Sequence, residues 1–572
     1  MPHVLYRSIR ELARSRSRIV VLASLIAAAG ASGCASTEPL VIRDYTPRGV
    51  APSDQRARGG YERAVTTASP EAQEWFSRGM FFCFAFDHEQ ADVAFKKALE
   101  HDPSMAMAHW GIAFAAGPNI NNIMMDEARN KAASEAIAKA KSLQANCSPV
   151  ERDLIAALDK RYAEPPPADR RALDEAYAEA MRTVHARHAA DPDVAAIFAE
   201  SLMALYPWDI WSPKGEPRPI TLELVGVIER GLERSPNHIG LNHCYIHTME
   251  ASPTPGKADA AADRLRDLAP GAPHLVHMPA HIDLRRGRYH AAVVANQRAT
   301  EADKARTERV GPGGFYALYR AHNYHFLQYA AMFEGRKQVA LQASRDVVKQ
   351  IPVEALDAYP LMLEGFLAAP YHAMVRFGMW DEILAEPQPD AKRWVTTATH
   401  HYARGIALAS LGRIDEARSE RELFEAAFER VPQDSYIANN PSRTVLEIGR
   451  SMLAGEVEYR AKNYDAAFTH LRDAVRRDEE LKYDEPWGWM QPAAHALGAL
   501  LLEQGRLADA EVVYRSDLER HPNNGWSLGG LAECLERTGR REEAIATRAQ
   551  AKKAWERSDV DMTVSCYCRR GA

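Results

Sequence analysis

Histidines gather in one part of the sequence at spacings that suit a metal site. Nine of the 21 histidines fall between residues 238 and 325, where even scatter over 572 positions would leave about three. His243 and His247 are four residues apart and Glu250 follows three later, so one helix would present two imidazoles and a carboxylate on one face. Imidazole nitrogen is the commonest transition-metal ligand, and carboxylates complete such ligand sets. The spacing therefore predicts a metal-binding or catalytic helix face.

Two further segments offer histidines at helical spacing. One holds three histidines within eight residues, and Pro279 inside it would kink or begin a helix. The other holds two histidines three residues apart, after a glycine-rich loop at 311–314. Metal ligands are expected among the whole set: His243, His247, Glu250, His274, His277, His281, His322 and His325.

The residue types leave the metal and its chemistry open. Imidazole suits copper, zinc and iron; Met278 beside His277 favours copper, whereas Glu250 favours zinc or iron. A His-Glu-x-x-His metalloprotease is excluded at 243–247, because Cys244 stands where its general base would be. The alternative interpretation is structural: the same histidines would join neighbouring helices through hydrogen bonds.

Two aromatic clusters accompany the histidines. One places two indoles around a carboxylate at a predicted helix end, and the other spreads tyrosines around the last two histidines. Their members are Trp208, Asp209, Trp211, Tyr316, Tyr319 and Tyr324. Such rings can line a ligand groove, although they more often pack in a core. The sequence contains no phosphate-binding glycine loop, nucleotide fingerprint or G-x-S-x-G elbow.

The elements that must position these side chains are helices that repeat. From about residue 70 onward the apolar pattern is helical, with almost no strand-type alternation. Small and aromatic residues followed by proline recur at intervals of four, three and five. They are Ala91, Phe95, Ala98 and Pro103, then Ala510, Tyr514, Asp517 and Pro522. This pattern resembles the tetratricopeptide repeat (TPR), which implies an all-α fold: an α-solenoid of TPR-like helix pairs, irregular in the centre.

The histidine-rich passage carries a second resemblance. The residues from Asn242 to Glu250, the run from His274 to His281, and His322-Asn323-Tyr324-His325 look like those of a group of bacterial tetratricopeptide-repeat proteins. The resemblance implies a helical-repeat fold and a location in the cell envelope. It brings no catalytic residues with it.

The N-terminus is typical of an export signal. Five arginines precede an apolar run from Ile19 to Gly33, which is shorter than the roughly 20 residues that span a bilayer as a helix. The run ends in Ala31-Ser32-Gly33-Cys34, which resembles the lipobox of bacterial lipoproteins. The resemblance implies a lipid on Cys34, and Ala35 after it implies sorting to the outer membrane. The alternative is an ordinary cleaved signal with a chance cysteine.

Six cysteines remain after Cys34, an even number that leaves the disulfide pairing open. Cys83 and Cys534 lie on apolar helical faces, so we expect them to be small buried residues. Cys566 and Cys568 are two apart near the C-terminus and are expected to pair elsewhere or to bind a soft metal.

The chain is expected to contain five parts. These are a lipoprotein signal peptide (1–33), a flexible tether (34–70), an N-terminal TPR-like region (71–215), a His-rich central region (216–335) and C-terminal TPR-like repeats (336–572). A net charge of -6 argues against nucleic acid as a partner and leaves the lipid anchor as the contact with membrane.

Two functions fit this sequence. The first is a periplasm-facing, lipid-anchored scaffold whose concave groove binds a protein or peptide, with a possible metal-binding centre. The second is a metal-dependent enzyme or metal-binding protein that uses copper, zinc or iron at the central His/Glu cluster.

Overall fold

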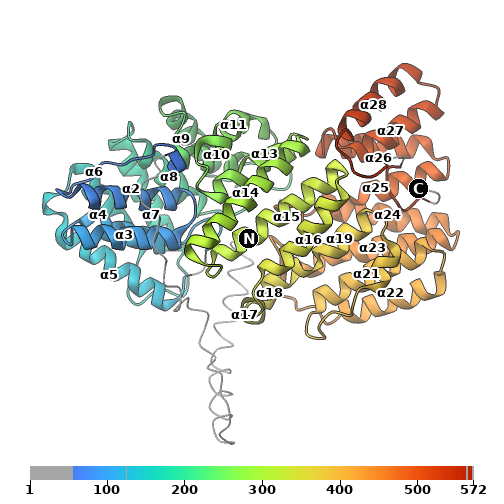
Figure 1. The fold of residues 1–572 in the computed structure, drawn as a ribbon, viewed down its shortest axis with the longest axis horizontal. Helices are drawn as coiled ribbons and strands as arrows, with labels where there is room; N and C mark the ends of the chain where they lie inside the picture. The colour runs from blue at the N-terminus through green and yellow to red at the C-terminus, as the bar shows by residue number, and fades with distance from the viewer. Residues whose placement is uncertain (1–55, 124, 562–563, 570–572) are drawn as a thin grey trace, which may run out of the picture. The chain divides into compact units, whose positions relative to one another are not determined.

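The computed structural model describes residues 56–123, 125–561 and 564–569. The predicted signal peptide and Cys34 lie outside these residues. Within the described part the chain is helical, apart from one short antiparallel pair of strands, β1 (Tyr436–Ile437) and β2 (Asn440–Pro441) (Figure 1). The predicted all-α fold is confirmed.

The chain forms two compact units whose division falls inside the His-rich region. Unit 1 extends to Met278 and also includes Ala302–Tyr316, whereas unit 2 comprises Pro279–Glu301 and the chain from Ala317 onward. Helix α14 (Tyr289–Val310) therefore contributes residues to both units.

Unit 1 begins with a 3-10 turn, η1, and continues through helices joined by turns and by longer loops. The bounds are η1 (Arg56–Arg58), α2 (Pro70–Phe84), α3 (His88–His101), α4 (Ala106–Ala116), α5 (Glu127–Leu143), η2 (Gln144–Asn146), α6 (Pro149–Leu158), η3 (Asp159–Arg161), α7 (Arg171–Arg187), α8 (Pro192–Met203), α9 (Thr221–Arg234), α10 (Ile239–Met249), η4 (Pro255–Ala258), α11 (Asp259–Leu268) and α12 (Pro273–His277).

Unit 2 contains the remaining helices, most of them in antiparallel pairs. The bounds are α13 (Pro279–Arg285), α15 (Tyr316–Glu334, its first residue in unit 1), α16 (Lys337–Gln350), α17 (Val353–Ala358), α18 (Pro360–Leu363), η5 (Glu364–Ala368), α19 (Ala369–Arg376), α20 (Trp380–Ala385), α21 (Trp394–Ser410), α22 (Ile414–Phe428), α23 (Ser442–Arg460), α24 (Tyr464–Glu479), α25 (Ala493–Glu503), α26 (Leu507–Arg520), α27 (Gly525–Arg537) and α28 (Arg541–Ala554).

The repeated aromatic positions pack in the same way in both units. A Cβ atom at Gly79 or Gly111 would lie 2.3 or 2.5 Å from the ring of Phe95. In unit 2, a Cβ atom at Gly498 or Gly530 would lie 2.6 or 2.1 Å from the ring of Tyr514. Each buried ring therefore fits between two helices that approach closely because they carry glycine, which is the packing expected of stacked helix pairs.

The turn inside a helix pair also repeats. At Gly412, φ is +82°, and the next N–H, of Arg413, donates to the carbonyl of Leu408 at 2.8 Å. This left-handed residue after a helix end is a position that favours glycine, which has no Cβ. The same geometry occurs at Gly287, Gly335, Gly378, Gly505 and Gly539, and at Lys462.

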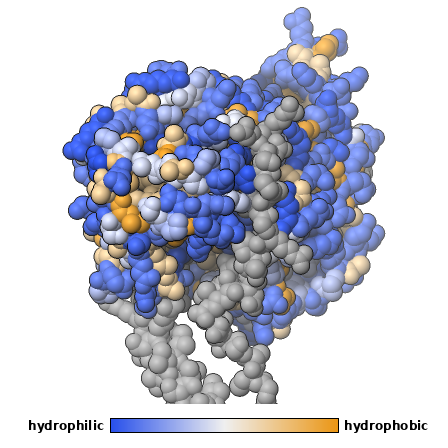
Figure 2. Space-filling model, turned by 60° about the vertical axis from the view of Figure 1, so that its left-hand side comes forward, coloured by the Kyte–Doolittle hydropathy of each residue, from blue (hydrophilic) through white to orange (hydrophobic). Residues whose placement is uncertain are grey.

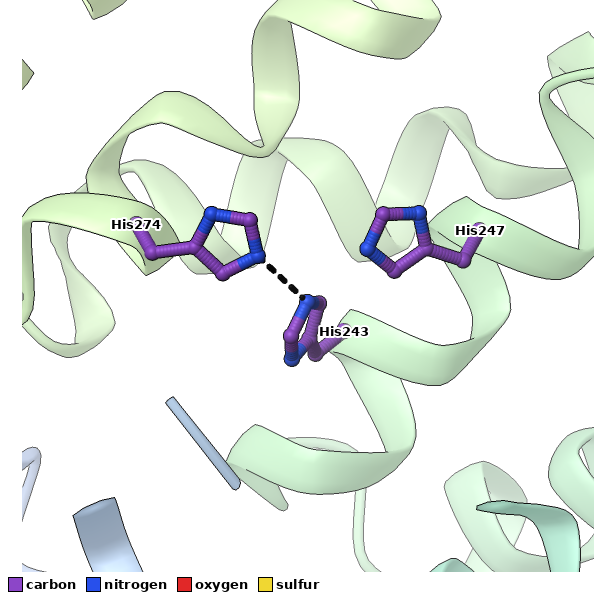
Figure 3. A group of neighbouring side chains, drawn as sticks. All are labelled: His243, His247 and His274. Carbon is purple, nitrogen blue, oxygen red and sulfur yellow. Dashed lines mark hydrogen bonds between the residues drawn. The ribbon is translucent and has the colours of Figure 1, made fainter. Parts of the chain in front are cut away.

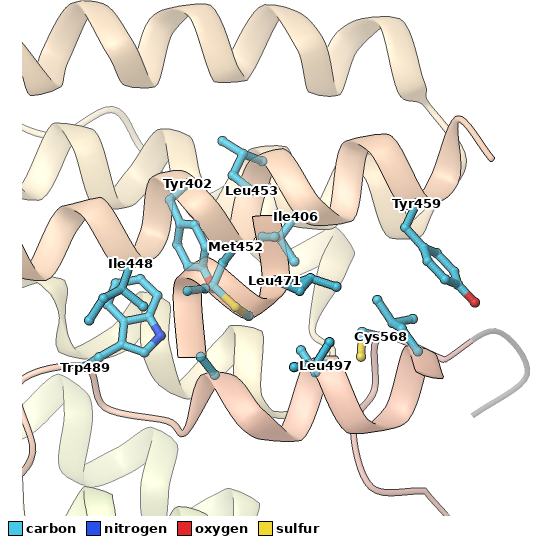
Figure 4. Packing of buried hydrophobic residues seen from close by; sticks show 14 of the residues in the cluster. Tyr402, Ile406, Ile448, Met452, Leu453, Tyr459, Leu471, Trp489, Leu497 and Cys568 are labelled. Carbon is cyan, nitrogen blue, oxygen red and sulfur yellow. The ribbon is translucent and has the colours of Figure 1, made fainter. Parts of the chain in front are cut away.

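The core of the C-terminal pairs is aromatic and aliphatic. Trp489 packs against Tyr402 with ring centroids 5.0 Å apart, close to Ile448 and Met452 (Figure 4). Side chains from α21, α23 and α25 meet in this core, so each pair covers the exposed face of the one before it.

Part of the predicted tether is bound to unit 1. Arg63 donates to Asp193 at 2.6 Å and to Asp191 at 3.0 Å, and Arg58 pairs with Glu74 at 2.8 Å. Arg58 and Arg63 are buried. These contacts hold the segment that contains Arg58 and Arg63 against helices α2 and α8.

The cysteines match the sequence analysis in part. Cys83 and Cys534 are buried and unbonded, as predicted. Cys566 and Cys568 form a disulfide with each other, not with distant partners. The expectation of separate partners is wrong, since the chain turns at Tyr567 and brings the Cα atoms of the two cysteines within 5.2 Å of each other.

No helix in the described residues is long and apolar enough to cross a membrane. The face of the molecule shown in Figure 2 is mainly hydrophilic, with small separate hydrophobic patches.

Candidate metal centre

Two helices of unit 1 carry the candidate ligands. Helix α10 begins after His238, whose ring accepts a hydrogen bond from the N–H of Leu241 at 3.1 Å and so caps the helix. Helix α12 begins at Pro273, a residue suited to the first helical position. Every residue of both helices is buried, so their histidines face protein on all sides.

Three imidazoles converge between these helices. His243 and His247 of α10 and His274 of α12 each place a ring nitrogen within 4.8 Å of the others (Figure 3). The Nε2 atoms of His243 and His274 are 3.2 Å apart. Three atoms spaced in this way lie within about 2.8 Å of a common point, so the rings would move inward to reach the ~2.0–2.1 Å of a zinc–imidazole bond. We call this group the three-histidine cluster.

The outer ring nitrogens of two members have fixed partners. Nδ1 of His243 lies 2.7 Å from the carbonyl oxygen of Phe84, which can only accept, so this nitrogen carries the proton. Nδ1 of His247 lies 2.9 Å from a carboxylate oxygen of Glu250, the residue that caps the end of α10. A partner on one ring nitrogen orients the other as a ligand, which is the arrangement found around metal-bound histidines.

Aromatic rings cover the cluster. Phe86, in the turn between α2 and α3, has its ring centroid 4.4 Å from that of His243 and 5.6 Å from that of His274. Trp208, which is half-buried, meets His247 edge-on at 5.4 Å. The imidazoles thus lie in a largely apolar shell, where a polar ligand set is strengthened because little water competes with it.

Buried charges hold the surrounding backbone. Arg306 makes a two-pronged ion pair with Asp87, at 2.7 and 2.8 Å, and its guanidinium lies 3.7 Å from the centre of the Tyr316 ring. The Tyr316 hydroxyl accepts a hydrogen bond from the backbone N–H of His274 at 3.2 Å. Residues 302–316 therefore support the cluster from a distant part of the sequence.

A comparison with protein families identifies one segment. Residues 501–554, which contain α26, α27 and α28, match the tetratricopeptide-repeat family model. Residues 501–554 are a tetratricopeptide repeat. The match agrees with the interval pattern at Ala510 to Pro522 and with the packing of Tyr514 between two glycines.

Comparisons of whole chains give weaker similarities. The chain is 12% identical to human IFIT1, solved as a dimer with m7Gppp-AAAA, with a TM-score of 0.32 over 86% of this chain and 91% of that one. It is 12% identical to a chain of the APC/C hetero-tetramer Cut9-Hcn1, with a TM-score of 0.28 over 86% of this chain and 90% of that one. These scores are too low to transfer a ligand or partner. No curated protein sequence matches the chain.

The other predicted ligands lie apart from the three-histidine cluster or beside it. His277 stacks on His274 at 5.9 Å within unit 1. In unit 2, His281 pairs with Glu485 at 2.8 Å and lies 5.8 Å from His322. The predicted set of eight is thus divided between the two units.

Two imidazoles of unit 2 are kept neutral. Burial, together with the neighbouring His281, lowers the pKa of His322 to about 4. Burial and the neighbouring His322 lower the pKa of His325 to about 3, and its ring meets Phe366 at 5.3 Å. Both rings are therefore uncharged at neutral pH.

The predicted groove residues have mostly structural contacts. Asp209 pairs with Arg218 at 2.6 Å, and the indole N–H of Trp211 donates to the carbonyl of Thr248 at 2.7 Å. Tyr319 is buried and Tyr324 is half-buried on α15. Of the six predicted groove residues, Trp208 contacts a ring of the cluster and Tyr316 contacts its backbone.

Phe86 was not a candidate in the sequence. A phenylalanine at a helix end is expected to be a buried core residue. Its residue type does not indicate a contact with histidines more than 150 positions away. The repeat offered one signal: Phe86 occupies a turn position that carries glycine in other helix pairs, so a bulky residue there is unusual.

Proposed function

We propose that the protein binds a transition-metal ion at His243, His247 and His274. The observation that supports this most directly is the convergence of three ring nitrogens within 4.8 Å, two of the rings being oriented through their other nitrogen. Histidines that only join helices need no third imidazole at the same place, whereas here three rings from two helices meet.

The donor set suits a metal with an open position. Three imidazoles match zinc, copper or iron, and three protein ligands leave a further position for water or a substrate. A metal held in this way polarises a bound ligand or lowers the pKa of bound water. Glu250 would make His247 a more basic ligand, and Phe84 would hold the tautomer of His243.

Elemental analysis of the full chain, purified without a histidine tag or chelator, tests the proposal. We expect about one equivalent of copper, zinc or iron in the wild type and its loss in His247→Ala. His372→Ala is the matched control, because His372 is also buried but belongs to unit 2 and is not a candidate ligand. A wild type that stays metal-free after incubation with each ion contradicts the proposal.

A second candidate function is protein binding by the repeats. The tetratricopeptide repeat at 501–554 supports a scaffold role, since stacked repeats make extended binding surfaces. Val512 and Ile545 in this segment are large apolar residues that are 69% and 72% exposed. Pull-down with the full chain should recover a stoichiometric partner, and a Val512→Asp, Ile545→Asp double variant should lose it; equal recovery with both proteins argues against this surface.

We also propose that the chain is anchored to the outer membrane by a lipid on Cys34. The support is the lipobox-like sequence Ala31-Ser32-Gly33-Cys34 after an apolar run. Anchoring would place both units in the cell envelope without a membrane-spanning helix.

A further inference from the structure

Two of the helix-pair turns carry a residue other than glycine at the left-handed position, Lys462, which is exposed, and Phe86, which is buried. Phe86 has φ +55°, and the next N–H, of Asp87, donates to the carbonyl of Phe82 at 2.9 Å. This is the geometry that glycine adopts at Gly412 and at five other helix-pair turns. A bulky side chain in the left-handed region is strained, so a phenylalanine here needs a compensating role.

The ring of Phe86 lies beside all three imidazoles of the cluster. It lies 4.4 Å from His243, 6.0 Å from His247 and 5.6 Å from His274, measured between ring centroids. Its plane is nearly parallel to those of His247 and His274, at 9° and 18°. One phenyl ring thus spans the face of all three imidazoles, and it is 3% exposed.

The other strained residues do not share this feature. Ala438 lies in the turn between β1 and β2, and Lys462 and Asn523 lie in turns of unit 2, all of them small, polar or exposed at the turn. Trp208, at φ +56°, is the second bulky residue in this conformation, and it too meets a ring of the cluster. The two strained aromatic residues therefore converge on one place in the molecule.

We propose that Phe86 is the shield of the metal position, a positioning residue that closes one face of the three-histidine cluster and slows exchange of the bound ion. The inference rests on the proposed metal site and adds its regulation. Trp208 covers His247 from the half-exposed side. The strain at both turns is retained because glycine, the residue that the repeat favours, would leave the imidazoles open to water and to competing ligands.

Release of metal to a chelator tests the shield. Full-length wild type, Phe86→Gly and Lys462→Gly are loaded with zinc, mixed with excess EDTA, and followed by a chromophoric zinc indicator. We expect Phe86→Gly to release zinc on the order of tenfold faster than the wild type, since shielding changes the dissociation rate. Lys462→Gly is the matched control, because it relieves the same left-handed strain in a turn that has no contact with the cluster, and its rate should be unchanged.

Chemical modification gives a readout that needs no metal. Diethylpyrocarbonate acylates accessible neutral imidazoles, and mass spectrometry of the His243, His247 and His274 peptides measures each rate. In metal-free protein we expect faster modification in Phe86→Gly than in the wild type or Lys462→Gly. Equal modification rates and equal zinc release in a Phe86→Gly protein of wild-type helicity would overturn the shield. A metal-free wild type with the expected modification rates contradicts the metal site alone.

A second variant keeps the test valid if Phe86→Gly does not fold. Asparagine tolerates the left-handed region and is found there at Asn523. If Phe86→Gly loses helicity by circular dichroism, Phe86→Asn replaces it with the same expected outcomes. Wild-type rates in folded Phe86→Asn would equally overturn the proposal.

Discussion

Glu250 would act on the proposed metal site through His247. Its carboxylate is buried and lies 2.9 Å from Nδ1, so it fixes the ring and increases its basicity. We expect Glu250→Gln to weaken metal binding by about tenfold, within the 10–100-fold range of such partners, while the fold is kept. A competition titration against a chelator of known affinity measures this. An unchanged affinity in a variant with wild-type helicity would show that Glu250 only ends the helix.

His372 makes unit 2 sensitive to acid. Burial lowers its pKa to about 4, whereas in the unfolded chain it is about 6.5. Above pH 6.5 both states are neutral; as pH falls from 6.5 to 4, the unfolded chain takes up a proton that the folded chain excludes, so stability is lost. The contribution is roughly 2–3 kcal/mol at pH 4. His372→Phe should flatten the melting temperature between pH 7 and pH 4, and a profile parallel to that of the wild type contradicts this.

The sequence supplied candidate ligands for the site, but it could not show which of them come together. The interval between His243 and His247 follows from helical periodicity, and so does their relation to Glu250. That His274 joins them, whereas His281 and His322 belong to unit 2, depends on tertiary packing, which spacing does not encode. Phe86 could not be recognised as a candidate, because its proposed role depends on a turn conformation that its residue type does not indicate.

Close helix packing makes single methyl groups costly at particular glycines. In α27 a Cβ atom at Gly530 would lie 2.1 Å from the Tyr514 ring, whose hydroxyl is held by Ser565 at 2.5 Å. Gly530→Ala should therefore destabilise the repeat by about 1–3 kcal/mol. Gly529 is the control, since a Cβ atom there meets nothing within 4 Å and alanine favours a helix by about 0.5–1 kcal/mol. Thermal unfolding of both variants measures the contrast, and equal melting temperatures would contradict it.

The helices were predictable because their signals are local. Small and aromatic residues at fixed intervals predicted the pairs around Phe95 and Tyr514, and both rings lie between glycines as that packing requires. Pro279 was expected to kink or begin a helix, and it begins α13. The attachment of Arg63 to Asp193 was not predictable, because the two residues are 130 positions apart and the surrounding segment is rich in glycine and proline.

The attachment of the whole chain can be tested at one residue. If Cys34 carries the lipid anchor, Cys34→Ser should move the protein from the membrane fraction to the soluble fraction of bacterial cells that express the full sequence. The metal content should be unchanged, since the three-histidine cluster lies far along the chain from the anchor. Fractionation and intact-mass measurement check the result, and a wild type without the mass of a diacylglyceryl group contradicts the anchor.

The two units cannot be separated by cutting the chain at one point, because unit 1 consists of two stretches of the sequence. Residues 302–316 return to unit 1 after the chain has already entered unit 2, and they bring Arg306 to Asp87 and Tyr316 to His274. A fragment that stops at Met278 holds all three imidazoles but lacks both supports. Producing unit 1 from a single continuous stretch of sequence would therefore remove Arg306 and Tyr316 from the three-histidine cluster's surroundings.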